Sequence, residues 1–176
     1  MGVFKVIRHT DGGYDYLNNA VNYVIHGHTD YGNAGSPNVD LDFAAEQMHY
    51  VKKYYDKRSG NPVFHFVVVY NTKTAYEIER AKSITRSIAN YFAGRYQIVW
   101  CVHEKHMSKK YGSVSSMCHA HFVMNSVSYI DGKMFSGNYA EIYSFLNYIK
   151  RVTNDKSWNI IYGSEKDYET DENDLI

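Results

Sequence analysis

The sequence lacks any long apolar run. No stretch approaches the roughly 18 consecutive apolar residues of a membrane-spanning helix, and residues 1–10 lack the apolar segment of a signal peptide. Cysteine is scarce: the only two, Cys101 and Cys118, lie within apolar, strand-like segments. Two buried thiols in a reducing compartment fit this pattern better than a disulfide scaffold does. We therefore expect a cytoplasmic protein.

The sequence also lacks net charge, with 19 basic and 19 acidic residues. The two kinds of charge are, however, unevenly distributed along the chain. Residues 164–176 contain six acidic residues and one lysine, a net charge of −5, which leaves +5 for residues 1–163. We expect one folded domain, 1–163, followed by an acidic flexible tail, 164–176. A mildly basic domain permits contact with phosphates without demanding it.

Among the features that are present, the segment Met117–Val127 is the most informative. Its phenylalanine and valines favour a β-strand. Alternate residues of a strand share a face, so His119 and His121 would project from the same side. Two imidazoles on one rigid strand provide half of a divalent-metal site. The alternative interpretation is two histidines that are hydrogen-bonded or face solvent.

The spacing of apolar residues predicts four further strands and four helices. The strands are residues 4–9, 63–70, 96–103 and 158–162, and the helices are residues 16–25, 40–56, 75–93 and 139–151. Two consecutive strands in this order predict an α+β fold, in which helices cover an antiparallel central sheet.

Local signals add detail to these elements. Gly94 is expected to cap the third helix, and Asp131-Gly132 predicts a tight turn. The second helix would leave Lys52 and Lys53 near water. Residues 104–117 are polar and are expected to form a connection.

A third histidine completes the predicted metal site. If the strand that ends at His103 pairs with the strand that begins near His119, His103 reaches the same end of the sheet as His119 and His121. Three protein ligands with open coordination positions are typical of a catalytic metal site. The sequence has no Cys-x-x-Cys motif to compete for this role.

These segments together resemble the catalytic core of mobilisation relaxases, the histidine-hydrophobe-histidine (HUH) endonucleases, and the MOBP type is the most similar. The resemblance covers about residues 15–162. It rests first on His103-Glu104-Lys105-His106, on His119 to Ser128 and on Asp131 to Phe135. It rests further on Asn19 to Val24, which is similar to the segment that carries the nucleophilic tyrosine, on Phe64-His65-Phe66, which is similar to the second motif, and on Trp158 to Ile161.

The resemblance implies a function and a set of site residues. His103, His119 and His121 would hold a divalent metal ion, Mn²⁺ or Mg²⁺, and Tyr23 would be the catalytic nucleophile. The reaction would be strand-specific nicking and rejoining of single-stranded DNA at an origin of transfer, through a 5′-phosphotyrosine intermediate. It would serve conjugative mobilisation of a plasmid or integrative element, with accessory relaxosome proteins as possible partners.

The chain also departs from the pattern of that family. Residues 104–118 separate the first histidine from the histidine pair, a longer interval than is usual. Lys105 stands where many relaxases carry an acidic residue. Either Glu104 or His106 could therefore replace His103 as the third ligand. Whether the chain is a stand-alone nuclease or an excised domain stays open.

The nucleophilic tyrosine has alternative candidates, and so does the base that would activate it. Tyr14, Tyr16 and Tyr31 lie near Tyr23 in the sequence. Because phenol has a pKa near 10, it needs assistance from the metal or from a local base. The candidate bases are His65, His26 and His28.

Three other functions compete with the relaxase interpretation. A rolling-circle replication initiator shares the histidine pair but carries its tyrosine on a later helix, where Tyr143 and Tyr148 are candidates. A non-catalytic DNA-binding module would use the histidines structurally. A small-molecule metallohydrolase would give no role to an N-terminal tyrosine.

Overall fold

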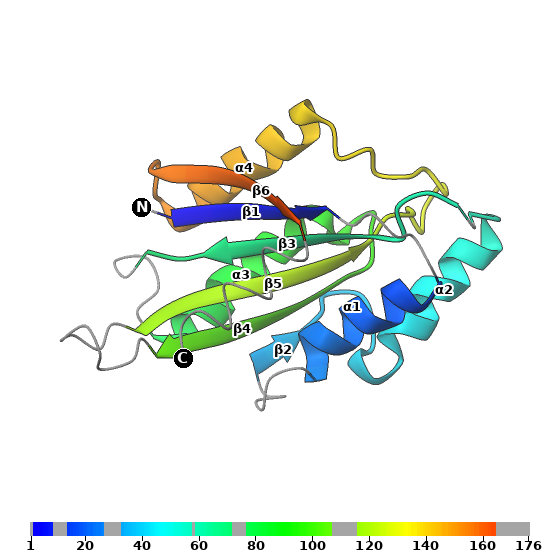
Figure 1. Ribbon diagram of the computed structural model, residues 1–176, viewed down its shortest axis with the longest axis horizontal. Coiled ribbons are helices and arrows are strands. Elements are labelled where there is room, and N and C mark those ends of the chain that lie inside the picture. Colours follow the sequence, from blue (N-terminus) through cyan, green and yellow to red (C-terminus); the bar gives the residue numbers. More distant parts are fainter. Residues whose placement is uncertain are drawn as a thin grey trace.

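The computed structural model describes residues 2–8, 14–26, 33–57, 59–71, 77–106 and 116–164. Within these residues, six strands form one sheet in the order β2-β4-β5-β3-β1-β6 (Figure 1). The strands are β1 (Gly2–Arg8), β2 (Ala34–Gly35), β3 (Val63–Val69), β4 (Ile98–His106), β5 (Ser116–Asn125) and β6 (Trp158–Ser164). All neighbouring pairs are antiparallel except β1 and β6, which are parallel.

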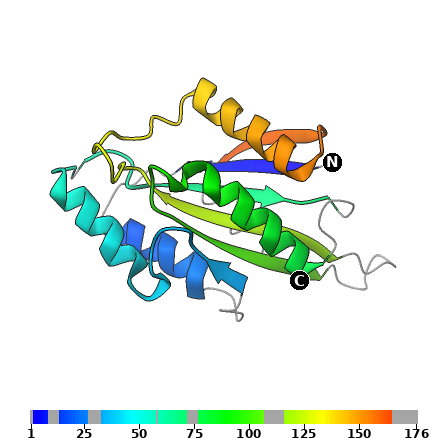
Figure 2. The same cartoon turned by 180° about the vertical axis from the view of Figure 1, so that it is seen from behind.

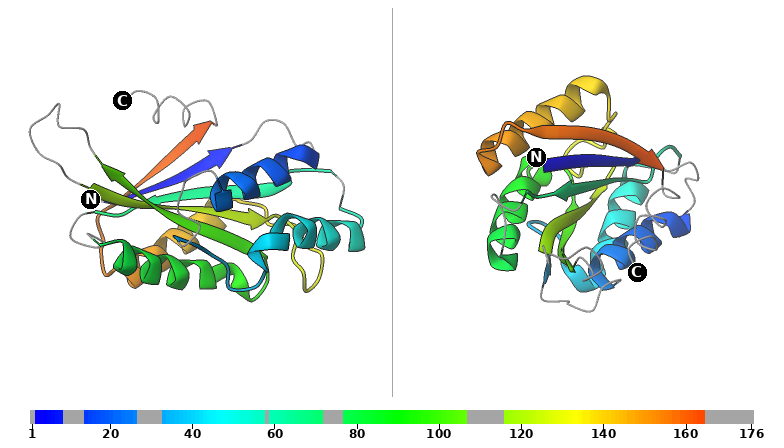
Figure 3. Two further views of the ribbon diagram at one scale, coloured as in Figure 1. Left: turned by 90° about the horizontal axis from the view of Figure 1, so that it is seen from below. Right: turned by 60° about the vertical axis from the view of Figure 1, so that its left-hand side comes forward.

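Helices cover both faces of this sheet. Successive side chains of the strands point alternately into two apolar clusters, one on each face. The helices are α1 (Tyr14–His26), α2 (Ala44–Tyr54), α3 (Ile78–Ala93) and α4 (Tyr139–Thr153), and a 3₁₀ turn, η2 (Leu41–Phe43), precedes α2. Helices α3 and α4 lie together on one face (Figure 2). Helix α1 lies on the opposite face (Figure 3, left), and it shares an apolar cluster with α2.

Strand β5 is the central element of the fold, because it pairs with β4 on one side and with β3 on the other. Ala120, Phe122 and Met124 point into the cluster with α3 and α4, and all three are fully buried. Val123 points the other way, into the cluster with α1 and α2. The alternation predicted from the sequence is therefore confirmed on this strand.

The predicted fold class and order of elements are confirmed, with the short β2 as an addition. The bounds of the hairpin differ from the prediction. Residues 104–106 continue β4 and residues 116–117 begin β5, because pairing in the hairpin extends to His106 opposite Ser116. Hydrogen bonding between the two strands thus includes polar residues whose composition does not predict a strand. The rest of the connection, residues 107–115, lies outside the described residues.

One detail of the second helix differs from the prediction, whereas the predicted cap of the third helix is confirmed. Lys52, expected near water, is half-buried, and its Nζ donates a hydrogen bond to Ser126 Oγ at 2.9 Å. Gly94 does cap α3, but with right-handed dihedral angles (φ −72°), so glycine is not required there. The turn at Gly132 is confirmed, with φ at +67°.

The two cysteines are buried and are not joined in a disulfide, as predicted. Among the described residues, no helix is both long enough and apolar enough to cross a membrane. Apart from Ser164, the acidic segment 164–176 lies outside the described residues, so the expected domain boundary stays a prediction.

Candidate metal and tyrosine site

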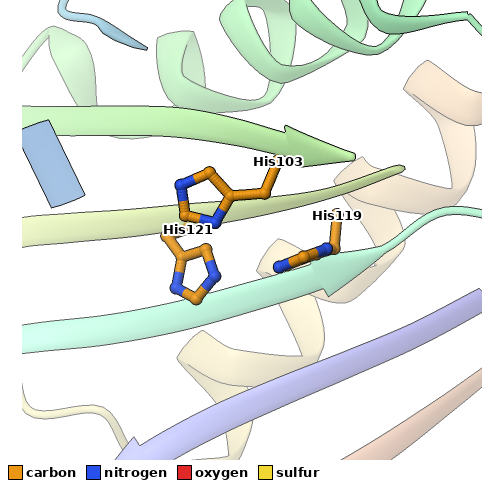
Figure 4. A group of neighbouring side chains, drawn as sticks. All are labelled: His103, His119 and His121. Carbon is orange, nitrogen blue, oxygen red and sulfur yellow. The ribbon is translucent and has the colours of Figure 1, made fainter. Parts of the chain in front are cut away.

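Three histidines come together on the face of the sheet that carries α1. His103 on β4 is the direct cross-strand partner of His119 on β5, and His121 lies two residues further along β5. The three rings lie close together above the sheet (Figure 4). Their centroids are 4.7 Å apart for His103 and His121, 5.1 Å for His119 and His121, and 5.2 Å for His103 and His119.

The donor set of this triad fits a divalent metal ion. One nitrogen of each ring lies within 4.8 Å of the corresponding nitrogens of the other two. His121 is fully buried and His103 is 9% exposed, so the protein holds these rings in place before any ion binds. Neutral imidazole is a common ligand of divalent metals. Three ligands on one side leave coordination positions for a substrate.

Tyr23 projects from α1 toward this triad. Its ring centroid lies 5.7 Å from that of His121 and 6.3 Å from that of His65. The helix is anchored by Leu17, Val21 and Val24, each at most 1% exposed, which pack in the cluster with the sheet. Tyr23 lies at the border of that apolar face and is half-buried. The early tyrosine and the histidine strand therefore meet in the fold.

The other N-terminal tyrosines are Tyr14, Tyr16 and Tyr31. Tyr16 is partly buried against the cluster of α1 and α2. The side chain of Tyr14 and the whole of Tyr31 lie outside the described residues. Among the described residues, Tyr23 is thus the tyrosine for which ring contacts with His121 and His65 define a position in the site.

His65 on β3 adds a fourth imidazole behind the triad. It is 5% exposed, and its Nε2 lies 3.3 Å from His121 Nδ1, within hydrogen-bonding distance. In the register of β3 and β5, His65 is opposite Val123 and Val67 is opposite His121. His65 and His121 are therefore diagonal neighbours on one face, close enough for long side chains to meet. The sequence placed His65 on a strand face, but not beside His121.

The other predicted candidates fall into three groups. Tyr143 and Tyr148 lie on α4, which covers the face of the sheet opposite to the triad. His26 is exposed at the end of α1. The side chains of Glu104 and His106, and the whole of His28, lie outside the described residues.

Comparison with known families agrees with this geometry. Residues 16–158 match the family model described as relaxase, MobA/VirD2-like, nuclease domain. The chain belongs to the MobA/VirD2-like relaxase nuclease family. No curated protein and no solved structure matches it. Membership supports a role for this relaxase domain in metal-dependent DNA nicking and transesterification on single-stranded DNA.

Proposed function

We propose that this relaxase nicks and rejoins one DNA strand at an origin of transfer, through a 5′-phosphotyrosine at Tyr23, during mobilisation of a plasmid or integrative element. The observation that carries the proposal is the position of the Tyr23 ring against His121, itself a member of the three-histidine cluster. The sequence motifs that resemble MOBP relaxases support that subtype. The proposed setting is the cytoplasm, with accessory relaxosome proteins as partners.

The proposed metal ligands are His103, His119 and His121. A bound Mn²⁺ or Mg²⁺ ion would supply positive charge beside the non-bridging oxygens of the scissile phosphate, whose negative charge grows during attack. The protein contributes a rigid support for these ligands. His103 and His119 face each other across a hydrogen-bonded strand pair, so their backbone separation is fixed by the sheet.

The proposed nucleophile is the phenolic oxygen of Tyr23. Its attack forms an oxygen–phosphorus bond and breaks the bond between phosphorus and the 3′-oxygen of the preceding nucleotide. The phenol loses a proton and the departing 3′-oxygen gains one. The product keeps one phosphodiester bond, so a 3′-hydroxyl can later attack phosphotyrosine and restore the DNA strand. A nucleophile on a packed helix favours this reaction, because its orientation is already restricted.

The test is covalent capture of DNA. Wild-type protein is incubated with a pool of random-sequence single-stranded oligonucleotides and Mn²⁺, and protein–DNA adducts are isolated under denaturing conditions. We expect adducts that EDTA prevents, and a nucleotide-bearing tryptic peptide that mass spectrometry maps to Tyr23. Tyr23→Phe should form no adduct, while the matched variant Tyr16→Phe should form it.

Two results would contradict the proposal. An adduct that persists in Tyr23→Phe would assign the nucleophile elsewhere. Tight binding of single-stranded DNA without metal and without an adduct, from the same oligonucleotide pool, would favour a non-catalytic DNA-binding module instead. Binding of that kind weakens steeply with added salt, because it depends on phosphate contacts.

A further inference from the structure

We infer that His65 is a positioning residue, which fixes the ring of His121 so that Nε2 of His121 faces the metal ion. The inference rests on the metal site of the proposed function, and it assigns a role to a residue outside the ligand set. Within the described residues, the cluster that can hold an ion consists of His103, His119 and His121. His65 contacts this cluster through His121.

The first step of the argument concerns the two nitrogens of His121. Nδ1 lies 3.3 Å from Nε2 of His65. A nitrogen engaged in that contact is not the one that binds an ion, so the metal ligand of His121 is Nε2. A neutral imidazole has one N–H donor and one lone-pair acceptor. If the lone pair of Nε2 binds metal, the proton of His121 is on Nδ1, which donates to His65.

The second step fixes the state of His65. Because Nε2 of His65 accepts this hydrogen bond, its own proton is on Nδ1. Both rings are buried, at 5% exposure for His65 and none for His121, so water does not compete for the contact. In such surroundings a hydrogen bond is stronger than in water. When Nε2 of His121 binds the ion, the pair therefore holds His121 in one tautomer and one ring orientation.

The third step concerns what holds His65 itself. It lies on β3, which is hydrogen-bonded to β1 on one side and to β5 on the other. The ring of Tyr23 lies 6.3 Å from its centroid, and the ring of His121 lies 5.6 Å away. The three rings form a compact triangle over the sheet. A change at His65 would thus alter the orientation of a metal ligand directly, and the surroundings of Tyr23 as well.

Outer partners of metal-bound histidines have a measurable effect. They are usually carboxylates, backbone carbonyls or waters, and their removal typically costs about 10–100-fold in metal affinity. Here the partner is a second histidine. An acceptor nitrogen can be mimicked by the amide of glutamine, whereas phenylalanine fills the space of the ring without offering any acceptor.

The experiment measures metal affinity and the tautomer of His121 separately. Metal-free protein is titrated calorimetrically with Mn²⁺ as wild type, His65→Phe and His65→Gln. The matched control is His49→Gln, since His49 is a partly buried histidine of α2 that is hydrogen-bonded to Asn18 and is not a member of the triad. We expect His65→Phe to lose about 10–100-fold in Mn²⁺ affinity, His65→Gln to retain most of it, and His49→Gln to be unchanged.

The second readout is the tautomer of His121, and its deciding measurement is made on wild type. Two-bond ¹H–¹⁵N correlation spectra of protein saturated with diamagnetic Mg²⁺, at mildly alkaline pH where imidazoles are neutral, identify the protonated nitrogen of each histidine. The signals of His121 are assigned by their loss in His121→Gln. We expect the Nδ1–H tautomer for His121 in wild type and in His65→Gln, and a mixture in His65→Phe.

The outcomes separate this inference from the proposed function. An Nε2–H tautomer for His121 in wild type would overturn the role of His65, as would unchanged Mn²⁺ affinity in His65→Phe. In either case metal binding and the adduct at Tyr23 would still stand. Failure of wild type to bind any Mn²⁺ would instead refute the metal site, and the inference with it.

Discussion

The ring of Tyr23 meets the ring of His121 edge-to-face, with centroids 5.7 Å apart. One residue belongs to the first helix and the other to the central strand, and the packing of α1 against the sheet joins them. Helix α2 packs in the same apolar cluster as α1. The candidate nucleophile is therefore held beside the candidate metal ligands by the core of the protein.

Removal of one proposed ligand should separate metal binding from folding. His119 is only half-buried, so His119→Ala should change the unfolding free energy of metal-free protein by less than about 1 kcal/mol. Wild type should gain about 2.7 kcal/mol of stability at a Mn²⁺ concentration of about 100 times Kd. The variant should gain almost none. Urea denaturation with and without Mn²⁺ measures both quantities.

The corresponding change at His121 should affect both properties. His121 is fully buried and is the partner of His65, so His121→Ala leaves a cavity and removes a buried hydrogen bond. We expect a loss of about 2–3 kcal/mol in metal-free protein, together with the loss of Mn²⁺ binding. Equal stabilities of the two alanine variants would contradict the difference in burial between the two positions.

Lys52 should make stability depend on pH in the alkaline range. Burial lowers the pKa of Lys52 from 10.5 to about 8. Between these values the unfolded chain binds more protons than the folded one, so stability rises with pH. Relative to Lys52→Met, wild type should gain on the order of 2 kcal/mol from pH 8 to 10.5, after allowance for solvent screening. Urea denaturation of both proteins across this range measures it, and parallel pH profiles would contradict it.

The histidine cluster was predictable because its determinants are local. His119 and His121 share a face through the period of a single strand, and His103 joins them through a hairpin between consecutive strands. Neither step requires knowledge of distant pairings. Alternation and sequence proximity are the two features that one sequence shows most directly.

The supporting contacts depend on pairings between distant segments. His65 meets His121 only because β3, rather than another strand, is the second neighbour of β5. Lys52 is half-buried because the end of its helix lies against Ser126. Helical spacing placed Tyr23 off the apolar stripe of α1, and its position against His121 follows from how that helix packs on the sheet. Such docking geometry is not encoded in any local pattern.

Glycine should be required at one predicted turn and dispensable at one predicted cap. Gly132 has a φ of +67°, and a Cβ there would collide with the ring of Tyr55. Gly132→Ala should therefore cost more than about 1 kcal/mol. Gly94 has a φ of −72° and open space around it, so Gly94→Ala should be neutral or stabilising by up to about 1 kcal/mol. Thermal unfolding of the pair measures the contrast, and equal losses would contradict it.

The tyrosines of α4 test the choice between a relaxase and a rolling-circle initiator. Both lie on the helix that covers the opposite face of the sheet. There Tyr148 donates a hydrogen bond to the carbonyl of Ser87 at 3.0 Å, and the ring of Tyr143 packs against that of Tyr139. Neither phenol can reach a phosphate at the triad without unfolding of that layer. Tyr143→Phe and Tyr148→Phe should therefore retain the covalent DNA adduct.

Tyr148→Phe should lose about 1 kcal/mol of stability with its hydrogen bond. Adduct yield on denaturing gels, beside urea denaturation, measures both effects. Loss of the adduct in a stably folded Tyr143→Phe or Tyr148→Phe protein would transfer the nucleophile to α4 and favour the initiator.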